Sequence, residues 1–193
     1  MKLALFGYGG HAREVAAQIG EPVDFFVDDE FVNEFTKPIS EFDPKEYQIM
    51  VAVADPKERE RIINRLPKET GLFSFVHPSV KILDKNVFIG RGSFIGVNCV
   101  LTTNIKIGKY ALLNRGVHIG HDCEIGDYFS AMPNTVVSGN VKIGNNCYFG
   151  TNSTVIEKKE ICDNVILGAG GVVIKNITEE GTYVGVPTKR VLK

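Results

Sequence analysis

The chain has 193 residues, of which 44% are hydrophobic and 23% charged, and its formal net charge is −1. This composition is typical of a globular protein with one or two domains. The lack of a basic excess argues against nucleic acid as a partner, and no apolar run approaches the ~20 residues of a membrane span. The first apolar run is also too short for a signal peptide, so we expect a cytoplasmic protein.

The first third of the chain alternates strand and helix patterns. A buried strand is followed by the segment Gly-Tyr-Gly-Gly-His and an amphipathic helix, then by a second strand, and later by a further strand and a charged helix. The expected strands cover residues 3–6, 23–27 and 48–54, and the expected helices cover 12–19 and 57–66. This order predicts a small parallel α/β sheet of the nucleotide-binding kind, which we assign to a domain at 1–75.

The glycine-rich turn after the first strand would place backbone N–H groups and a helix N-terminus beside an anion. Asp28 and Asp29 follow about twenty residues later, where an acid can bind ribose hydroxyls or a base edge. The domain is too small to suit a whole dinucleotide, so a nucleotide-sugar fits better. The alternative is that these glycines only form a tight turn.

From residue 83 onward, an apolar residue occupies every sixth position, and we expect no insertion in this run. The sixteen positions are Leu83, Ile89, Ile95, Leu101, Ile107, Leu113, Ile119, Ile125, Ala131, Val137, Ile143, Phe149, Val155, Ile161, Leu167 and Val173. Glycine directly follows eight of them, at Gly90, Gly96, Gly108, Gly120, Gly126, Gly144, Gly150 and Gly168. A step of six matches neither the 3.6-residue helix period nor ordinary strand alternation.

A step of six predicts a three-sided parallel β-helix at 76–193. Each hexad supplies one short strand and one turn, three hexads close a triangular coil, and coils stack ~4.8 Å apart. The aliphatic side chains fill the interior. Glycine is expected to relieve crowding at the corners and to adopt backbone angles that other residues avoid.

The four cysteines are Cys99, Cys123, Cys147 and Cys162, and the first three share one small-residue position of the hexad. None belongs to a CxxC pair, so we expect buried reduced thiols rather than a zinc or redox site.

Two histidines lie inside the repeat, His118 and His121, and the second precedes Asp122. An accessible histidine beside a carboxylate suits a general base near neutral pH, although a plain surface histidine fits the spacing equally well. A metal site shared by three subunits is a weaker alternative, because a third histidine is absent from the repeat. We therefore expect no metal.

The hexads, with Gly-Tyr-Gly-Gly-His ahead of them and Gly-Val-Pro-Thr-Lys-Arg at 185–190 behind them, resemble the bacterial hexapeptide-repeat sugar O-/N-acyltransferases. The subgroup typified by sialic acid O-acetyltransferase and the nucleotide-4-amino-4,6-dideoxysugar N-acetyltransferases is the most similar. The resemblance implies a small Rossmann-like α/β domain followed by a left-handed parallel β-helix, assembled as a homotrimer. Thr188 departs from the commoner alanine before Lys189, which bears on the substrate rather than on the class.

The resemblance also implies roles for particular residues. The catalytic set is His121, its supporting acid Asp122 and the substrate-positioning Asn114. The nucleotide-sugar set is Gly9, Gly10, His11, Asp28 and Asp29. Acetyl-CoA, as cosubstrate, would lie between two prisms near Ser130, Gly139, Gly150, Thr151, Gly168, Ala169, Gly170 and Lys189. Two interpretations of Lys189 and Arg190 stay open, as ligands of the CoA phosphates or as solvated charge of the tail.

The implied reaction is direct acetyl transfer from acetyl-CoA to the amino group of a nucleotide-linked 4-amino-4,6-dideoxysugar. Two alternatives stay open at this point. One is O-acetylation of a free sugar such as sialic acid, and the other is a non-catalytic scaffold that binds nucleotide-sugars.

Overall fold

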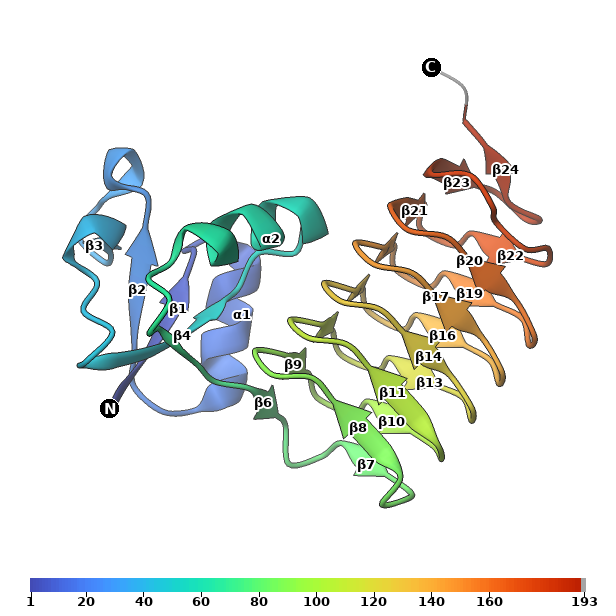
Figure 1. Cartoon of the computed structure of the whole chain (residues 1–193), viewed down its shortest axis with the longest axis horizontal. Coiled ribbons are helices and arrows are strands. Elements are labelled where there is room, and N and C mark those ends of the chain that lie inside the picture. The colour runs from blue at the N-terminus through green and yellow to red at the C-terminus, as the bar shows by residue number, and fades with distance from the viewer. Residues whose placement is uncertain (192–193) are drawn as a thin grey trace.

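The computed structural model describes residues 1–191, and the last two residues of the predicted second domain lie outside this range. An α/β domain runs directly into a three-sided prism (Figure 1). The α/β domain contains β1 (Lys2–Phe6), α1 (Gly10–Ile19), β2 (Val23–Val27), η1 (Asp29–Phe31), β3 (Lys37–Pro38), η2 (Ile39–Glu41), β4 (Tyr47–Val51), α2 (Pro56–Arg65) and β5 (Gly71–Leu72). Neither α-helix exceeds ten residues, which is far short of a bilayer span.

The five strands of the α/β domain are parallel and lie in the order β3-β2-β1-β4-β5. The two helices cover opposite faces of this sheet, since Ile62 of α2 packs with one set of alternating strand residues and Val15 of α1 with the other. The predicted order of strands and helices is confirmed. The two-residue strands β3 and β5 were not predicted, because so short a strand has no periodicity to detect.

The ends of both helices follow from their sequence. Asp55 caps α2 by accepting a hydrogen bond from the Glu58 N–H, and Pro56 occupies the first turn, where its missing N–H costs nothing. Helix α1 ends at Ile19 and is capped by Gly20, whose φ of 71° lies in the left-handed region that glycine adopts freely.

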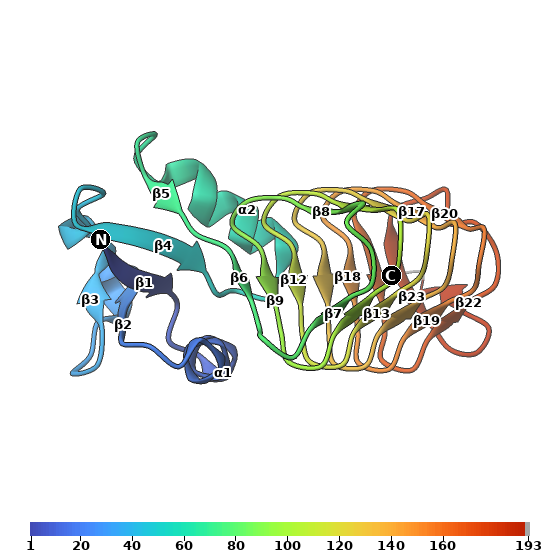
Figure 2. The same ribbon diagram turned by 90° about the horizontal axis from the view of Figure 1, so that it is seen from below.

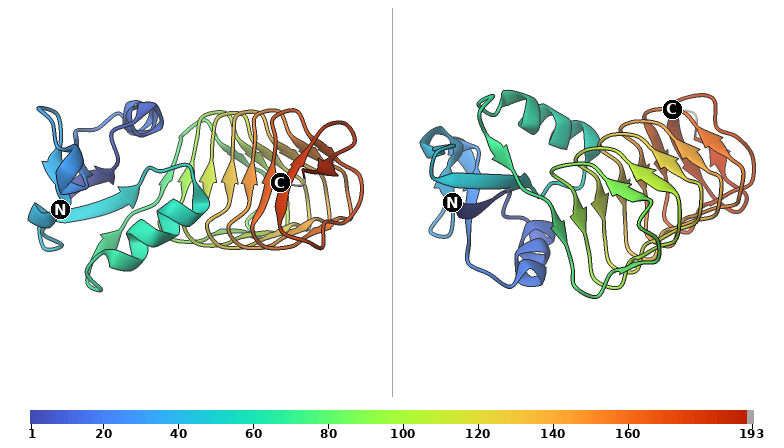
Figure 3. Two further views of the ribbon diagram at one scale, coloured as in Figure 1. Left: turned by 90° about the horizontal axis from the view of Figure 1, so that it is seen from above. Right: turned by 60° about the horizontal axis from the view of Figure 1, so that its bottom comes forward.

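The prism is built from short parallel strands that stack coil upon coil (Figure 2). They are β6 (Phe75–Val76), β7 (Lys81–Ile82), β8 (Val87–Ile89), β9 (Phe94–Ile95), β10 (Val100–Leu101), β11 (Ile105–Ile107), β12 (Leu112–Leu113), β13 (His118–Ile119), β14 (Glu124–Ile125), β15 (Ser130–Ala131), β16 (Val136–Val137), β17 (Lys142–Ile143), β18 (Tyr148–Phe149), β19 (Thr154–Val155), β20 (Glu160–Ile161), β21 (Val165–Leu167) and β22 (Val172–Val173). Strands β23 (Gly181–Val184) and β24 (Lys189–Arg190) form an antiparallel pair at the far end (Figure 3).

Each of the three sheets has its own chemical character on its outer surface. The docked face (β6-β9-β12-β15-β18-β21-β23) lies against the α/β domain. The valine face (β7-β10-β13-β16-β19-β22) carries the row Val100, His118, Val136, Thr154 and Val172. The charged face (β8-β11-β14-β17-β20) carries Lys106, Glu124, Lys142 and Glu160 in alternating sign.

The interior of the prism is apolar, and the inward residues of the hexads are almost all buried. One predicted position is wrong, because Leu83 is 66% exposed and Ile82 instead pairs with the inward Leu101. The step between Ile82 and Ile89 is therefore seven residues. The prediction of a run without insertion is thus wrong in the first coil. An extra residue is tolerated there because this coil is the end of the prism and has a neighbouring coil on one side only.

The explanation of the hexad glycines is half confirmed. A Cβ at Gly108 would lie 2.6 Å from the backbone carbon of Gly126 in the next coil, so these glycines do relieve crowding. The unusual backbone angles occur elsewhere, on the third residue after each aliphatic, where φ is positive in every regular turn. That position carries Gly92, Asn98, Asn104, Tyr110, Gly116, Asp122, Tyr128, Asn134, Asn140, Asn146, Asn152, Lys158, Asn164 and Gly170. Asparagine dominates because it tolerates the left-handed region better than most residues do.

The α/β domain is held on the docked face by an apolar layer and one buried cation. Leu5, Val15 and Met50 of the domain pack with Phe94 and Leu112 of the prism. The Arg59 side chain of α2 is 2% exposed and donates hydrogen bonds of 2.6 to 3.2 Å to five backbone carbonyls. These belong to Val53, Ala54, Tyr110, Tyr128 and Phe129. Arg59 thus connects the end of the central sheet to two successive coils.

Candidate active site

His121 lies at the corner of the prism between the valine face and the charged face, which we call the His121 corner. Its side chain is 55% exposed, and Nδ1 lies 2.7 Å from Oδ2 of Asp122. With Asp122 ionised, this contact is a hydrogen bond that Nδ1–H donates, and it leaves Nε2 with its lone pair. The sequence prediction of a histidine beside its own carboxylate is thus matched by a hydrogen-bonded pair.

Asp122 is held from two directions. It occupies the left-handed turn position with φ 59°, and its Oδ1 accepts a 2.7 Å hydrogen bond from the amide Nδ2 of Asn104. These hydrogen bonds, first that from Asn104 and then that from His121, lower the pKa of Asp122 below its ordinary value. The carboxylate is therefore ionised at neutral pH.

Gly139 lies directly over the imidazole in the next coil. A Cβ at this position would lie 2.5 Å from Cε1 of His121, so any residue larger than glycine would displace the imidazole from this position. The Gly139 carbonyl accepts from Lys158 N–H, whereas its own N–H donates to no group within residues 1–191. An unused backbone donor thus lies beside a basic nitrogen.

Asn114 does not join this cluster within one chain. It follows β12 at the corner between the docked face and the valine face, which we call the Asn114 corner. It is 4% exposed, and its Oδ1 accepts from Arg115 N–H at 2.7 Å. Arg115 in turn pairs with Glu14 of α1. His121 and Asn114 therefore occupy opposite edges of the valine face.

The predicted cofactor residues divide between the same two corners. Gly139 is at the His121 corner. The Asn114 corner carries a column of small residues in its last coils: Gly150, Thr151, Gly168, Ala169 and Gly170. Contacts join the column, since Gly170 N–H donates to Thr151 O at 2.8 Å and a Cβ at Gly150 would lie 2.7 Å from Ala169 N.

The remaining predicted cofactor residues lie apart from that column. Ser130 is fully buried under the α/β domain and donates to Ala54 O at 2.7 Å, so no surface is left for a cofactor. Lys189 is exposed on β24. Arg190 is engaged by the Glu179 carboxylate and the Glu180 carbonyl, which leaves Lys189 as the freer cation of the two.

The predicted nucleotide-sugar residues also separate. A hollow between the turn after β1 and the end of β2 is lined by Gly9 and Asp28, together with Tyr8, Phe31 and Asn33, which the sequence analysis did not single out. Asp28 pairs with Arg65 of α2. Asp29 lines a neighbouring hollow, which Asp28 also lines, and its Oδ1 accepts from Ser40 N–H at 3.2 Å.

Gly10 and His11 begin α1, and Gly10 is exposed whereas His11 is half-buried. A Cβ at Gly9 or Gly10 would meet nothing within 4 Å, and the positive φ of this turn, 107°, belongs to Gly7. His11 points toward the prism, where its ring lies edge-on to Phe94 at 6.3 Å and its Nε2 is buried without a partner. Burial lowers the pKa of His11, so this imidazole is neutral at pH 7.

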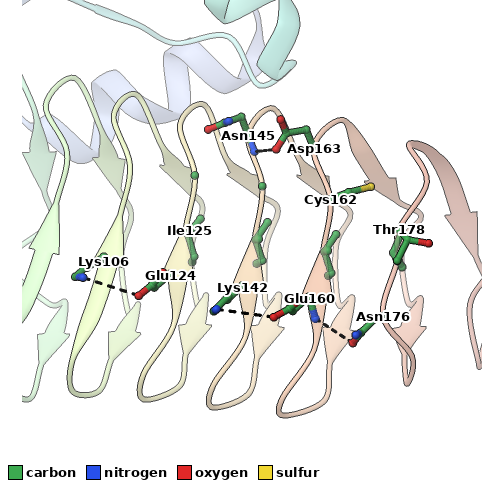
Figure 4. Close-up of a pocket in the computed structure, with 15 residues that line it drawn as sticks. Lys106, Glu124, Ile125, Lys142, Asn145, Glu160, Cys162, Asp163, Asn176 and Thr178 are labelled. Carbon is green, nitrogen blue, oxygen red and sulfur yellow. Dashed lines mark hydrogen bonds and ion pairs between the residues drawn. The ribbon is translucent and has the colours of Figure 1, made fainter.

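A broad hollow on the charged face contains none of the predicted site residues (Figure 4). Lys106 pairs with Glu124 and Lys142 with Glu160, each at 3.8 Å, along exposed strands. Such exposed pairs contribute little energy and are ordinary for a solvated sheet. Within residues 1–191, moreover, no three metal-binding side chains gather in one place.

Comparison with known families and structures agrees with this architecture. Residues 2–66 match the PglD N-terminal domain, and residues 122–157 match the bacterial transferase hexapeptide (six repeats). A mutant of perosamine N-acetyltransferase from Caulobacter crescentus, in complex with CoA and GDP-perosamine, superposes with a TM-score of 0.87 at 23% identity, over 100% of this chain and 98% of that chain. At this identity, the likeness shows the fold alone, a small α/β domain followed by a left-handed parallel β-helix, as predicted.

Two further structures have the same domain order. The acetyltransferase domain of PglB from Neisseria gonorrhoeae, in complex with acetyl coenzyme A, has a TM-score of 0.68 at 26% identity and covers 98% of both chains. WeeI from Acinetobacter baumannii has a TM-score of 0.74 at 24% identity, over 99% of this chain and 100% of that chain.

Proposed function

We propose that the chain is a bacterial hexapeptide-repeat sugar acetyltransferase that uses acetyl-CoA, because residues 2–66 match the PglD N-terminal domain and residues 122–157 match the bacterial transferase hexapeptide. Its acceptor is the amino group of a nucleotide-linked 4-amino-4,6-dideoxysugar. The observation that carries the proposal is the His121–Asp122 pair, which has a free Nε2 beside the unused Gly139 N–H. Two of the similar structures are complexes, one with CoA and GDP-perosamine and one with acetyl coenzyme A, which supports the same chemistry.

The reaction is a direct transfer in one active site. The sugar amine attacks the thioester carbonyl carbon while Nε2 of His121 takes a proton from the amine. The resulting oxyanion accepts a hydrogen bond from Gly139 N–H. The carbon–sulfur bond then breaks, the amide forms, and the CoA thiolate leaves and takes the proton back from the imidazolium. Asp122 keeps Nδ1 protonated and stabilises the transient positive charge.

The division of the site between two corners supports a homotrimer. If three prisms surround an axis with their valine faces inward, the His121 corner of each copy meets the Asn114 corner of its neighbour. The small-residue column of one copy would then face the imidazole of the next, with acetyl-CoA between them. The valine face suits this role, because Val100, Val136 and Val172 are apolar and only half-buried in one chain. Light scattering after gel filtration should give three times the 21.2 kDa chain mass.

The hollow beside Gly9 and Asp28 is the proposed nucleotide subsite, with the open first turn of α1 for the phosphates. Gly10 and Asp29 lie beside this hollow. The His11 side chain points toward the prism, so His11 contributes to the subsite only as part of the first turn of α1. In the cell, we expect the protein in the cytoplasm, where nucleotide-sugars and acetyl-CoA are both present.

The test is a thioester-cleavage assay with acetyl-CoA and a panel of UDP-, dTDP- and GDP-linked 4-amino-4,6-dideoxysugars. At least one should be acetylated, and His121→Ala should lower kcat by ~10²–10⁴. His77→Ala is the matched control, because the imidazole Nδ1 of His77 hydrogen-bonds Ser79 at the start of the prism and its loss should leave kcat unchanged.

Other results would favour the alternatives. Turnover of a free sugar such as sialic acid, with none of the nucleotide-sugars, would indicate an O-acetyltransferase. Binding of a nucleotide-sugar by calorimetry without any thioester cleavage would indicate a non-catalytic scaffold. Full activity of His121→Ala would remove the assigned base.

A further inference from the structure

A third side chain extends the His121–Asp122 pair on the side away from the imidazole. Asn104 Nδ2 donates to Oδ1 of Asp122, and Oδ2 of the same carboxylate accepts from His121 Nδ1, both at 2.7 Å. Each carboxylate oxygen thus has its own donor. The row Asn104–Asp122–His121 spans two coils at the His121 corner.

The repeat itself places Asn104 there. Asn104 and Asp122 are eighteen residues apart and occupy the same turn position in successive coils, with φ of 51° and 59°. Backbone bonds fix the two turns, since Asp122 N–H donates to Thr103 O at 3.1 Å. Because stacked turn positions project their side chains in parallel, the Asn104 amide reaches the Asp122 carboxylate without a change in the backbone of either turn.

We propose that Asn104 is a positioning residue, which holds the Asp122 carboxylate in the orientation that keeps the His121 proton on Nδ1. The proposal rests on the proposed function, because it takes His121 as the base. Asp122 is 43% exposed, so a carboxylate held from one side only could rotate toward water and release the imidazole. The Asn104 bond is also the largest cause of the lowered pKa of Asp122, which keeps the carboxylate ionised.

Two substitutions separate the hydrogen bond from the backbone turn. Asn104→Gly keeps the left-handed turn and removes the side chain. Asn104→Asp keeps the shape and replaces the donor with a carboxylate that repels Asp122. We expect kcat to fall by ~3–30-fold in Asn104→Gly and by at least as much in Asn104→Asp, with the KM of both substrates unchanged.

A spectroscopic readout distinguishes positioning from folding. In the wild-type protein, two-bond ¹H–¹⁵N spectra should show His121 with its proton on Nδ1. In Asn104→Gly, a larger share of the Nε2–H tautomer should appear. Asn164→Gly is the matched control, because Asn164 has the same turn conformation at a different corner, three coils further along, and its loss should change neither kcat nor the spectrum.

The outcomes separate the two proposals. If His121→Ala retains full activity, the proposed function fails, whatever Asn104 does. If His121→Ala is inactive while Asn104→Gly and Asn104→Asp keep wild-type kcat and tautomer, His121 stays the base and the positioning role is overturned. A fall in kcat for Asn104→Gly alone, with Asn104→Asp fully active, would also overturn it, since the donor would then be unnecessary.

Discussion

The prism and the α/β domain are stabilised in different ways. In the prism, successive coils repeat the same backbone bonds, an inward apolar residue and a turn residue in the left-handed conformation. In the α/β domain, single contacts have no counterpart elsewhere, and Arg59 with its five carbonyls is the clearest case. Loss of one repeated element is therefore a local defect, whereas loss of a unique contact should affect a whole interface.

The largest stability effect is expected at Arg59. Arg59→Ala leaves buried carbonyls of both domains without a donor, and we expect the free energy of unfolding to fall by about 3–5 kcal/mol. Burial lowers the pKa of Arg59 to about 9, so it is still a cation at neutral pH. A lysine here would keep the positive charge but not the hydrogen bonds of the guanidinium group. Urea unfolding monitored by circular dichroism measures the change.

Arg61→Ala is the control on the same helix. Arg61 is exposed and pairs with Glu58 one turn away, so its loss should leave the unfolding midpoint nearly unchanged. Equal unfolding midpoints for the two variants would show that docking of the domains does not depend on the buried cation.

A smaller effect is expected for a repeated element. Gly108→Ala would place a Cβ against the backbone of the next coil, so we expect a loss of about 1–3 kcal/mol as the coils shift apart. Gly10→Ala, in the open first turn of α1, should be neutral or stabilising by up to about 1 kcal/mol. If both substitutions behave alike in thermal unfolding, crowding between coils is not the reason for the hexad glycines.

The smallest effect is a gain. Lys158 has a φ of 57° and makes no side-chain hydrogen bond or ion pair within residues 1–191, so Lys158→Gly should relieve strain and stabilise the protein by about 1 kcal/mol. Lys159→Gly, at the adjacent ordinary position, should bring no gain. A Tm that falls in both variants would contradict the assignment of strain to this turn.

The same contrast explains what could be predicted from the sequence. The prism was predictable because its period is local, so each aliphatic in 89–173 reports its own inward position. Leu83 was misplaced because sequence periodicity cannot distinguish it from the neighbouring Ile82 when both are apolar. The predicted turn glycines were also given the wrong angles, since the period marks two special positions and the one with positive φ is most often asparagine.

The site was predictable only in part. The His121–Asp122 contact joins adjacent residues, so the sequence contains it directly. Ser130 was placed wrongly near a cofactor surface, because the hexad gives its outward direction but not the domain that covers it. Arg59 was not found at all, since a charged residue on a charged helix carries no signal of burial by a partner more than fifty residues away in sequence.

The residue type at the left-handed turn position can also guide the search for functional residues in other proteins with this fold. Among its fourteen occupants, ten are asparagine or glycine, and the four that differ are Tyr110, Asp122, Tyr128 and Lys158. The carbonyls of Tyr110 and Tyr128 accept hydrogen bonds from Arg59, and their tilted rings have centroids 4.9 Å apart. Asp122 accepts the hydrogen bond of the His121 imidazole. Three of the four exceptions thus coincide with a docking surface or a reactive pair. In an unfamiliar prism of this kind, left-handed turn positions that hold neither asparagine nor glycine would be the first candidates for docking or catalytic residues.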